Sequence, residues 1–329
     1  MKVLVIGGAG YIGSHTTYEL IRAGHEVVVL DNLSTGRMGA IHADARFFWG
    51  DIRRKSDITK VLLAEEKTRP VDVVMHFAAK LVVPESVLKP LEYYENNVEG
   101  VRTMLEAMVD CGVKNIVFSS TAAVYGEPDN PLCSEDDPTA PINPYGETKI
   151  ASEQLIKWVA AAHGMNYCIL RYFNVAGADQ SLRIGLDKDQ LTHLIPLIMQ
   201  SALGMREKLS IFGSDYPTSD GTCIRDYIHV TDLAQAHVSG AQHILDTGDS
   251  LLLNLGSGKG FSVKEVVDAA LELFDFNYEF APRRAGDPAK LIANSNRARE
   301  ILGWEPKLSL TDMIKSDYAY RKQLQQDTD

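Results

Sequence analysis

Tyr145 and Lys149 lie four residues apart in the segment "NPYGETKIASEQL", which is predicted to be helical from about Tyr145. Residues at this spacing share one face of a helix, so the phenol and the ammonium would be neighbours. A tyrosine is a poor base because its pKa lies near ~10, but a neighbouring ammonium stabilises the phenolate and lowers that pKa. The pair therefore predicts proton transfer by Tyr145, although this spacing alone also occurs often by chance.

A single hydroxyl is predicted at the end of a buried strand in the segment "SSTAAVYG". The apolar run Ile116–Phe118 comes directly before it, and the strand should end near Thr121. Ala122 and Ala123 follow, and neither side chain can do acid or base chemistry. Thr121 is thus a candidate to hydrogen-bond a reacting group, while the two alanines are also expected if they only pack tightly at the strand end.

A glycine-rich turn joins the first apolar run to the first predicted helix in "KVLVIGGAGYIGSHTTYELIRAG". Gly7, Gly10 and Gly13 would allow a tight turn, a close approach of a pyrophosphate to the backbone, and close packing of the helix on the strand. The second apolar run ends at Asp31, where a carboxylate would accept hydrogen bonds from an adenosine ribose and repel a 2′-phosphate. The pattern predicts NAD binding, whereas a structural glycine turn and a surface aspartate are the alternative.

The elements that must position these residues alternate along the first half of the chain. Short β-branched runs are followed by amphipathic helical segments, which predicts a parallel sheet with helices on both faces. The predicted strands are "VLVI", "VVVL", "RFFW", "VDVVM", "NIVFSS" and "NYCIL". We therefore expect an α/β protein with a Rossmann-type, doubly wound parallel sheet and a second, smaller α/β substrate lobe.

The strict alternation is lost after about residue 174, where polar segments rich in glycine and proline separate short apolar elements. We expect residues 1–174 to form the NAD-binding domain and residues 175–329 to form mainly the substrate lobe. A strand followed by a helix at about 222–245 is expected to return to the first domain.

Composition excludes several classes of protein. The chain has 329 residues and a formal net charge of −11, which would repel a nucleic acid. No segment approaches the ~20 consecutive apolar residues of a membrane helix. The four cysteines lie far apart without metal-ligand spacing, so neither a metal site nor a disulfide framework is indicated. We expect a cytoplasmic protein.

Beyond these patterns, the chain resembles the extended short-chain dehydrogenase/reductases, and within them the enzymes that epimerise nucleotide sugars. The motifs run from residue 7 to about residue 294, nearly the whole chain. They are "GGAGYIG", "DNLSTG", "HFAA", "YYENNV", "SSTAAVYG", "PYGETK", "RYFN", "IFGSDYPTSDGT", "RDYIHVTDLA" and "RRAGDPA".

The resemblance implies a catalytic triad of Thr121, Tyr145 and Lys149 and transient oxidation of a UDP-sugar at C4 with tightly bound NAD. Tyr145 would remove the proton of the 4-hydroxyl, Lys149 would hold the nicotinamide ribose and lower the pKa of Tyr145, and Thr121 would hydrogen-bond the reacting oxygen. Related dehydratases and decarboxylases usually carry acidic residues after the hydroxyl. Ala122 and Ala123 at those positions therefore favour epimerisation.

The resemblance also implies binding residues for both ligands. The cofactor would contact the glycine turn, the ends of the strands and the start of the catalytic helix, namely Gly7, Gly10, Tyr11, Ile12, Gly13, Asp31, Asn32, Asp51, Ile52, Phe77, Ala78, Asn96, Tyr145, Lys149 and Tyr172. The UDP-sugar would contact Thr121, Tyr145, Phe173, Asn174, Phe212, Arg225, Arg284 and Asp287. The resemblance also suggests a homodimer.

Three positions depart from the family pattern. Lys80 stands one place before the position where some members carry a lysine near the nicotinamide, so no role is assigned to it. His193 replaces an asparagine that often contacts the substrate, and is otherwise an ordinary helix-face histidine. Leu291 lies near a position whose bulk decides whether an N-acetylated sugar can turn, so N-acetylhexosamines remain candidate substrates beside hexoses and pentoses.

Other functions are compatible with parts of the pattern. A net oxidoreductase or dehydratase acting on another nucleotide sugar would accumulate NADH or release water. A non-catalytic NAD-sensing protein would keep the fold but would have no need of Thr121, Tyr145 and Lys149 together.

Overall fold

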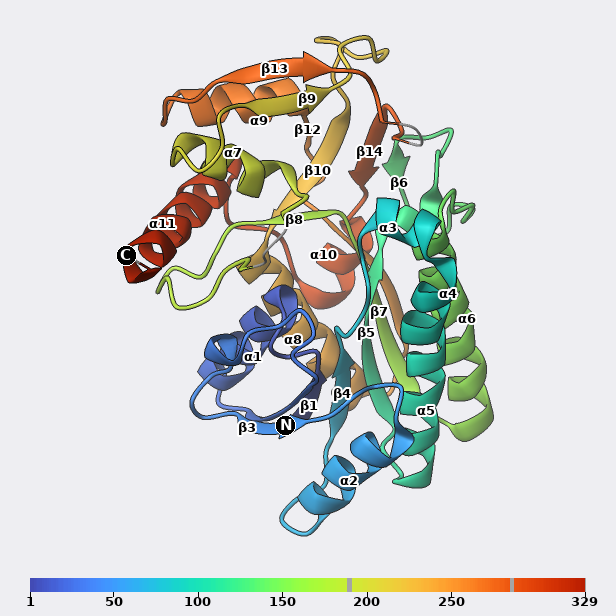
Figure 1. Cartoon of the computed structure of the whole chain (residues 1–329). Helices are drawn as coiled ribbons and strands as arrows, with labels where there is room; N and C mark the ends of the chain where they lie inside the picture. The colour runs from blue at the N-terminus through green and yellow to red at the C-terminus, as the bar shows by residue number, and fades with distance from the viewer. Residues whose placement is uncertain (188–190, 285–286, 329) are drawn as a thin grey trace.

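The computed structural model describes residues 1–187, 191–284 and 287–328 and is built around a seven-stranded parallel sheet (Figure 1). The strand order is β11-β7-β5-β4-β1-β2-β3, and every neighbouring pair is parallel. The strands are β1 (Lys2–Ile6), β2 (Glu26–Asp31), β3 (Arg46–Trp49), β4 (Val73–His76), β5 (Asn115–Thr121), β7 (Asn166–Tyr172) and β11 (Leu251–Leu255). The predicted α/β class and all six predicted strands are confirmed, and β11 is a seventh that the pattern did not reveal.

Helices cover both faces of this sheet because alternate residues of each strand point to opposite faces. In β1, Leu4 and Ile6 pack into a core with one group of helices, whereas Val3 and Val5 pack into a second core on the other face. The first group is α2 (Lys55–Glu66), α5 (Gly100–Asp110) and α6 (Pro144–His163). The second group is α1 (Tyr11–Arg22), α8 (Val230–Thr247) and α10 (Asn296–Leu302).

Short helical segments precede α5 and follow β5. These are η1 (Met38–Ala40), α3 (Val83–Leu88), α4 (Pro90–Tyr93), the π-helical η2 (Tyr94–Glu99) and η3 (Ala122–Tyr125). Gly112, with φ of +72°, adopts the left-handed conformation just after α5, as expected for the glycine that ends a helix.

Two smaller sheets stand beyond one end of the large sheet, at the top of Figure 1. One has the order β12-β10-β14-β6 with β8 paired to β10, and the other is the pair β13-β9. Their strands are β6 (Leu132–Cys133), β8 (Asn174–Ala176), β9 (Leu209–Phe212), β10 (Ile224–His229), β12 (Gly260–Ser262), β13 (Tyr278–Ala281) and β14 (Lys290–Ala293). A third apolar core joins them to α7 (Leu194–Ala202), α9 (Val263–Leu271) and α11 (Leu310–Thr328).

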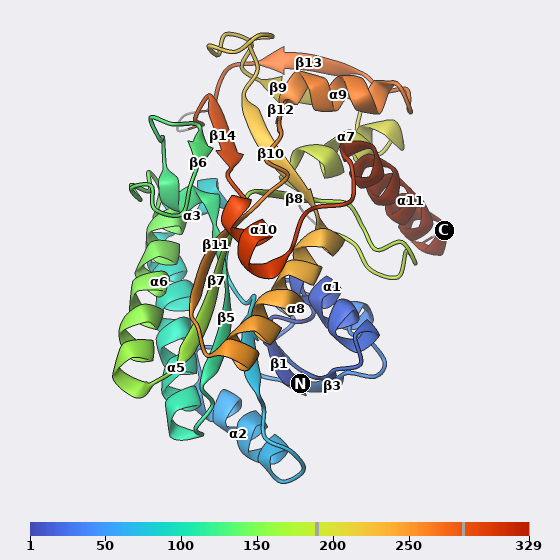
Figure 2. The same cartoon turned by 180° about the vertical axis from the view of Figure 1, so that it is seen from behind.

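The segment near residues 222–245 divides between these parts of the fold. Its strand, β10, belongs to a smaller sheet, whereas its helix, α8, packs on the large sheet beside α1, as the view from behind shows (Figure 2). The next strand, β11, then joins the edge of the large sheet beside β7. None of the described helices is long and apolar enough to cross a membrane.

Candidate active site

The glycine turn between β1 and α1 has the conformation that the sequence predicts. Gly7 has φ of +85°, and a Cβ there would lie 2.6 Å from the backbone nitrogen of Ala78. A Cβ on Gly13 would lie 2.2 Å from the Gly7 oxygen, so the helix and the strand approach too closely for any side chain. Gly10 is the N-cap of α1, and the first turn of that helix carries no acidic residue. The turn therefore presents backbone N–H groups and a positive helix end that fit a pyrophosphate.

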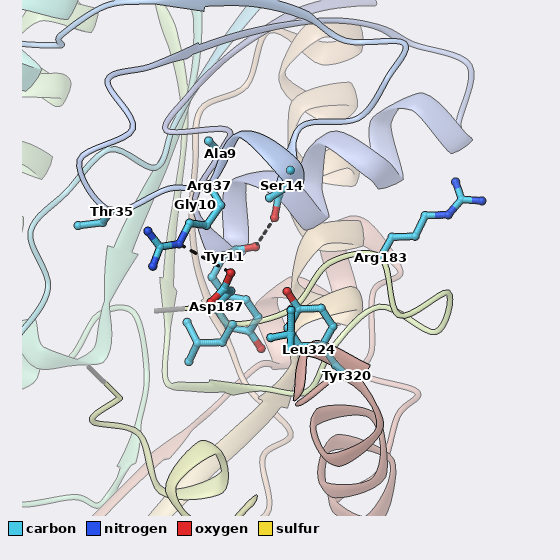
Figure 3. Close-up of a pocket in the computed structure, with 14 residues that line it drawn as sticks. Ala9, Gly10, Tyr11, Ser14, Thr35, Arg37, Arg183, Asp187, Tyr320 and Leu324 are labelled. Atoms are coloured by element: carbon cyan, nitrogen blue, oxygen red, sulfur yellow. Dashed lines mark hydrogen bonds and ion pairs between the residues drawn. The ribbon is translucent and has the colours of Figure 1, made fainter. Parts of the chain in front are cut away.

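A cavity of about 170 Å³ opens beside this turn (Figure 3). Gly10, Tyr11 and Ser14 line it from the start of α1, and Thr35 and Arg37 line it from the loop after β2. The opposite wall comes from the second half of the chain and consists of Arg183, Gly185, Leu186, Asp187, Tyr320 and Leu324. Arg37 Nε lies 3.7 Å from Asp187 Oδ2 across the cavity.

Asp31 is tied to the glycine turn at the end of β2. Its carboxylate accepts hydrogen bonds from the backbone nitrogens of Ala9 at 3.0 Å and Leu33 at 2.8 Å. Burial raises the pKa of Asp31, while these hydrogen bonds oppose the rise. The carboxylate thus shapes the loop that faces the turn, in addition to being available to a ribose.

Asp51, expected at the adenine, is held by Arg53, which donates from Nη2 at 2.6 Å and from Nε at 2.9 Å. These hydrogen bonds are the main reason that the pKa of Asp51 lies well below its usual range. Asn32 also donates to Asp51, at 3.2 Å, which links two of the predicted adenosine-side residues directly. Ile52 is buried beneath Gly100 of α5.

The predicted proton-transfer residues meet at the carboxyl edge of the large sheet. Thr121 ends β5, and its side chain hydrogen-bonds Tyr145 in the first turn of α6. Asn143 caps this helix by accepting a hydrogen bond from the Gly146 nitrogen at 2.9 Å. The cap and Pro144 fix where the helix begins, and so where the phenol of Tyr145 lies.

Lys149 lies one helical turn beyond Tyr145 and is 3% exposed. Its ammonium donates to the Ser119 oxygen at 2.7 Å and lies 4.9 Å from the centre of the Phe118 ring. Tyr172, at the end of the neighbouring strand β7, hydrogen-bonds the Ser119 hydroxyl. The ends of β5 and β7 therefore bring the predicted catalytic and nicotinamide-side residues together.

Burial dominates the electrostatics of Tyr145 and Lys149 in the protein by itself. Burial raises the pKa of Tyr145 to about 12, and the hydrogen bond with Thr121 is the influence that opposes the rise. Burial also lowers the pKa of Lys149 to about 7. The predicted lowering of the Tyr145 pKa combines Lys149 with the positive ring of oxidised NAD, so it stays a prediction for the protein with bound NAD.

The two alanines after Thr121 differ in their surroundings. Ala122 is 4% exposed and packs in an apolar cluster with Val124 and Phe173, so a small apolar residue is needed there. Ala123 is half-buried, and its carbonyl oxygen would lie 2.7 Å from a Cβ placed on Gly146. Close packing therefore accounts for Ala122 and for the glycine that follows Tyr145.

Thr121 and Tyr145 apart, the predicted substrate residues lie on the smaller sheets and their loops, except for Phe173, which is buried in the cluster with Ala122. Asn174 begins β8, and Arg225 lies in β10. Arg225 Nη2 is 3.6 Å from Asp287 Oδ1, and the Arg284 guanidinium lies 3.9 Å from the centre of the Phe212 ring. The two arginines are thus each placed against another predicted substrate residue.

Asn97, the neighbour of the predicted cofactor residue Asn96, makes more hydrogen bonds than Asn96 does. Asn97 is 2% exposed, receives a hydrogen bond from the backbone nitrogen of Lys80 at 2.9 Å and donates to the Lys80 oxygen at 2.9 Å and to Thr148 at 3.0 Å. Asn96, the predicted cofactor residue, donates to Asn97 at 2.9 Å. Asn97 therefore joins η2, the chain after β4 and α6, a role that the sequence reading missed.

The positions that depart from the family pattern are placed as follows. The Lys80 ammonium lies 2.5 Å from Glu92 Oε2. His193 is the N-cap of α7 and not a residue of the helix face. Leu291 pairs with Arg225 between β14 and β10 and packs against the cluster that contains Phe173.

Several residues of the cavity beside the glycine turn were missed by sequence reasoning. Thr35 and Arg37 stand in "DNLSTGR", directly after the predicted Asp31 and Asn32, so their proximity was a usable signal. Arg183, Asp187 and Tyr320 had no local signal, because the fold brings them to the cavity from more than a hundred residues away in the chain.

Comparison with known proteins gives consistent matches. Residues 3–256 match the NAD dependent epimerase/dehydratase family. The UDP-glucose 4-epimerase of Halalkalibacterium halodurans is 52% identical over 326 residues, which cover 98% of this chain and 96% of the relative.

Solved structures match over the same extent. A crystal structure of a UDP-glucose 4-epimerase is similar with a TM-score of 0.94 and 48% identity, covering 98% of each chain. The UDP-glucose 4-epimerase of Stenotrophomonas maltophila, solved with bound NAD and formylated UDP-arabinopyranose, matches with a TM-score of 0.95 and 39% identity over 99% of each chain.

Proposed function

The chain belongs to the NAD dependent epimerase/dehydratase family, and from this premise we propose that it is a UDP-glucose 4-epimerase that interconverts UDP-galactose and UDP-glucose. The observation that carries the proposal is the meeting of Tyr145, Thr121 and Lys149 at the sheet edge to which the glycine turn also belongs. A protein that only sensed NAD would need the turn but not this trio.

The glycine turn, with no room for a Cβ at Gly7 or Gly13, fits the pyrophosphate of NAD. When bound, NAD supplies the hydride acceptor and donor for C4 of the sugar. We assign the nucleotide to Gly7, Gly10, Tyr11, Ile12, Gly13, Asp31, Asn32, Asp51, Ile52, Phe77, Ala78, Asn96, Tyr145, Lys149 and Tyr172. We also propose that residues 1–174, with α8 and β11, form the cofactor domain and that most of residues 175–329 form the substrate lobe.

Tyr145 takes the proton from the sugar 4-hydroxyl and returns it after the sugar has turned. Its pKa of about 12 means that the phenol is protonated at neutral pH, so it needs a nearby positive charge to act as a base. Lys149, one helical turn away, carries that charge and binds the nicotinamide ribose. Thr121 hydrogen-bonds the reacting oxygen, and Ala122 and Ala123 leave no acid or base for elimination of water.

The UDP moiety is assigned to the smaller sheets. Arg225 and Arg284 supply positive charge for the diphosphate of the substrate, which an acidic chain otherwise lacks. Phe212 stacks on the uracil, Asp287 binds the uridine ribose, and Phe173 and Asn174 line the sugar end. Arg284 lies over Phe212 and Arg225 faces Asp287, so each arginine is already beside another residue assigned to the UDP moiety.

The function is tested by incubating the purified protein with UDP-galactose and no added nucleotide, and following the sugar by proton NMR. UDP-glucose is expected to appear, because the bound NAD is regenerated in each cycle. The Tyr145→Phe variant should retain NAD and lose about a hundredfold or more of the turnover. Tyr167→Phe removes a phenol at the opposite end of β7 and should leave turnover unchanged.

Three outcomes would contradict the proposal. Accumulation of NADH would indicate a net dehydrogenase, and loss of water from the product would indicate a dehydratase. If UDP-galactose is not converted even after NAD is supplied, the substrate is another UDP-sugar, and UDP-N-acetylhexosamines and UDP-pentoses would be tested next.

We also propose a homodimer formed through α5 and α6, and a cytoplasmic location. A groove between these helices is lined by four apolar residues, Leu105, Val109, Leu155 and Val159, and by four polar or charged residues, Arg102, Glu106, Asp110 and His163, and Trp158 on α6 is 75% exposed. Apolar side chains in a surface groove of this kind suit a second copy of the chain. All four cysteines are free thiols, which suits a reducing compartment.

Sedimentation velocity tests the dimer. Val159→Arg should convert the dimer to a monomer, whereas Trp49→Arg, which changes an exposed aromatic residue on the edge strand β3, should not. A sedimentation coefficient that is unchanged in Val159→Arg would contradict this interface.

A further inference from the structure

Glu153 continues the spacing of the catalytic helix, one turn after Lys149 and two turns after Tyr145. Its side chain is 0% exposed. The carboxylate accepts hydrogen bonds from the Ser120 hydroxyl at 2.5 Å and from Arg171 Nε at 3.0 Å, both on Oε1. Arg171 Nη2 donates to Oε2 at 2.7 Å. A buried carboxylate that accepts three such hydrogen bonds from two residues is fixed in one orientation.

The partners of Glu153 lie immediately before two residues of the proposed active site. Ser120 and Arg171 are opposite each other in the register of β5 and β7. The next pair in that register is Thr121 and Tyr172. Glu153 therefore bridges the two strands at the last pair before their functional ends, and fixes how the two ends lie relative to α6.

Arg171 extends the contact to other parts of the fold. It is 2% exposed, donates to the Tyr125 hydroxyl at 3.1 Å and to the Glu135 oxygen at 3.4 Å. Tyr125 in turn donates to Asn254 of β11 at 2.7 Å. The position of Glu153 is therefore determined from several elements and does not depend on α6 alone.

The charge of Glu153 also acts on Lys149. The Phe118 ring and the Ser119 oxygen from β5 face the ammonium, His76 from β4 is close enough to interact with its charge, and Tyr145 lies one turn before it on the same helix. His76 is neutral, because burial lowers its pKa to about 3. Burial lowers the pKa of Lys149 to about 7, and the charge of Glu153 is the influence that raises it.

We propose that Glu153 is a positioning residue for the proposed epimerisation, which holds Thr121 and Tyr172 in register and keeps the buried Lys149 ammonium protonated. The expected effect of Glu153 on turnover rests on the proposed function. The expected effect of Glu153 on the protonation of Lys149 does not depend on any substrate. A residue that only stabilised the fold would not change the protonation of Lys149.

The test is the titration of Lys149 in the Glu153→Gln variant, followed by the ¹³Cε NMR signal of labelled lysine. Glu153→Gln should lower the titration midpoint of Lys149 by about one pH unit, because an attractive charge is lost. The decrease of kcat with rising pH should begin about one pH unit lower as well, with KM for UDP-galactose little changed. Glu147→Gln removes the same charge from an exposed position of the same helix and should change neither quantity.

Glu153→Gln leaves the Arg171 guanidinium buried without its carboxylate, which can prevent folding. The double variant Glu153→Gln/Arg171→Gln removes both charges and should fold, with the lowered Lys149 midpoint retained. An unchanged midpoint in this folded double variant would overturn the proposal. A wild-type protein that does not epimerise UDP-galactose would overturn the proposed function, while the Lys149 titration would still decide the role of Glu153.

Discussion

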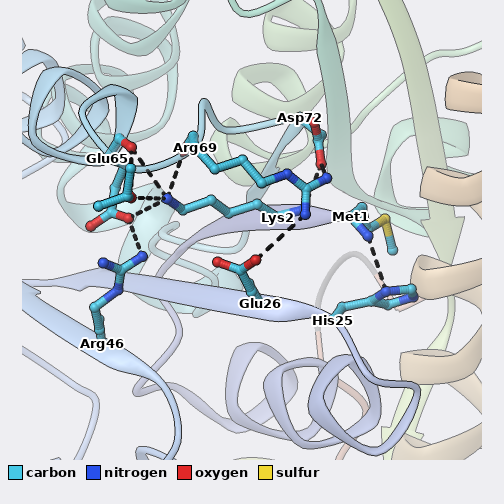
Figure 4. Close-up of polar contacts among 9 residues, drawn as sticks. Met1, Lys2, His25, Glu26, Arg46, Glu65, Arg69 and Asp72 are labelled. Carbon is cyan, nitrogen blue, oxygen red and sulfur yellow. Dashed lines mark hydrogen bonds and ion pairs between the residues drawn. The ribbon is translucent and has the colours of Figure 1, made fainter.

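Two buried lysines at opposite ends of the parallel sheet have very different surroundings. Lys2, at the amino end of β1, is 0% exposed, and its ammonium lies 2.6 Å from Glu65 Oε2. It also donates to the Arg69 oxygen at 2.6 Å, to the Thr68 hydroxyl at 3.1 Å and to the Glu65 oxygen at 3.3 Å (Figure 4). All the hydrogen-bonding capacity of this ammonium is used within the protein.

Lys149, at the carboxyl edge, is 3% exposed but has one hydrogen bond, to the Ser119 oxygen at 2.7 Å. Among the described residues, no carboxylate forms an ion pair with it, and Glu153 acts on it from one helical turn away. Two of its three N–H donors are therefore available to a ligand. Lys149 is the lysine proposed to act in catalysis, so the comparison teaches that its distinguishing feature is not burial, which Lys2 shares, but the small number of its partners within the protein.

The largest effect is expected from removing the lysine with few partners. Lys149→Met should reduce turnover about a hundred- to a thousandfold, because a positive charge beside Tyr145 is lost in a dry site. The free energy of unfolding should stay the same or rise, because the variant no longer buries an amine with one hydrogen bond. The NMR assay with UDP-galactose and urea denaturation measure the two quantities.

Lys157→Met is the matched control, on the same helix and farther from the sheet edge. It should leave turnover unchanged. A Lys149→Met protein that was destabilised by more than about 2 kcal/mol would show that Lys149 is a structural lysine like Lys2.

The opposite result is expected at the other end of the sheet. Lys2→Met removes the buried one of the two cations paired with Glu65, the other being the half-exposed Arg46, and should lower the free energy of unfolding by up to about 3–5 kcal/mol. Turnover per folded molecule should not change. Lys2→Met/Glu65→Leu removes both buried charges and should recover most of the loss, which would show that the penalty comes from the buried carboxylate that has lost Lys2.

The comparison also predicts how stability changes with pH. The pKa of Lys149 is about 7 in the folded protein and lies at its ordinary value of 10.5 when the chain unfolds. Between these values the unfolded chain binds more protons, so the contribution of Lys149 to stability rises with pH, by up to about 1.4 kcal/mol per pH unit. Below the folded pKa the whole cost of burying the ammonium is present.

Urea unfolding of the wild type and of Lys149→Met, at equal nucleotide content and over pH ~6 to ~9, measures this dependence. The stability advantage of the variant should be largest at the acidic end and should shrink as the pH rises. A difference that is constant with pH would mean that Lys149 keeps its ordinary pKa in the fold.

The sequence alone was sufficient to predict those features of the fold and the candidate site whose pattern lies within one short segment. The four-residue spacing of Tyr145 and Lys149, the glycines of the first turn and the six apolar strands are each readable within a short segment, and the geometry agrees with them. The position of Thr121 beside Tyr145 could also be predicted, because the carboxyl ends of parallel strands meet at one edge of a sheet.

The rest depends on contacts between distant segments. Lys2 and Glu65 are 63 residues apart in the chain, and nothing in "MKVLVI" separates a buried lysine from an exposed one. The strand β11 was missed because it follows the region where the alternation of strands and helices is lost. The pKa of Tyr145 in the protein alone depends on burial, which spacing does not report.

The smallest effect is expected at a third lysine, which lies close to the site but is paired within the protein. Lys80 is 34% exposed, and its ammonium lies 2.5 Å from a Glu92 carboxylate that is 46% exposed. Exposed pairs of this kind contribute about 0–1 kcal/mol. Asn97 holds the backbone of Lys80 at both its N–H and its oxygen, so this part of the chain stays in place without the side chain.

Lys80→Ala should therefore change turnover by less than about twofold and the free energy of unfolding by less than about 1 kcal/mol. Lys89→Ala, which removes another cation near Glu92, is the control and should behave in the same way. A loss of turnover in Lys80→Ala comparable to that of Lys149→Met would mean that the Lys80 ammonium leaves Glu92 during the reaction. A lysine that is paired within the protein would then be acting on the ligand. The number of partners that a lysine has within the protein would therefore not separate functional lysines from structural ones.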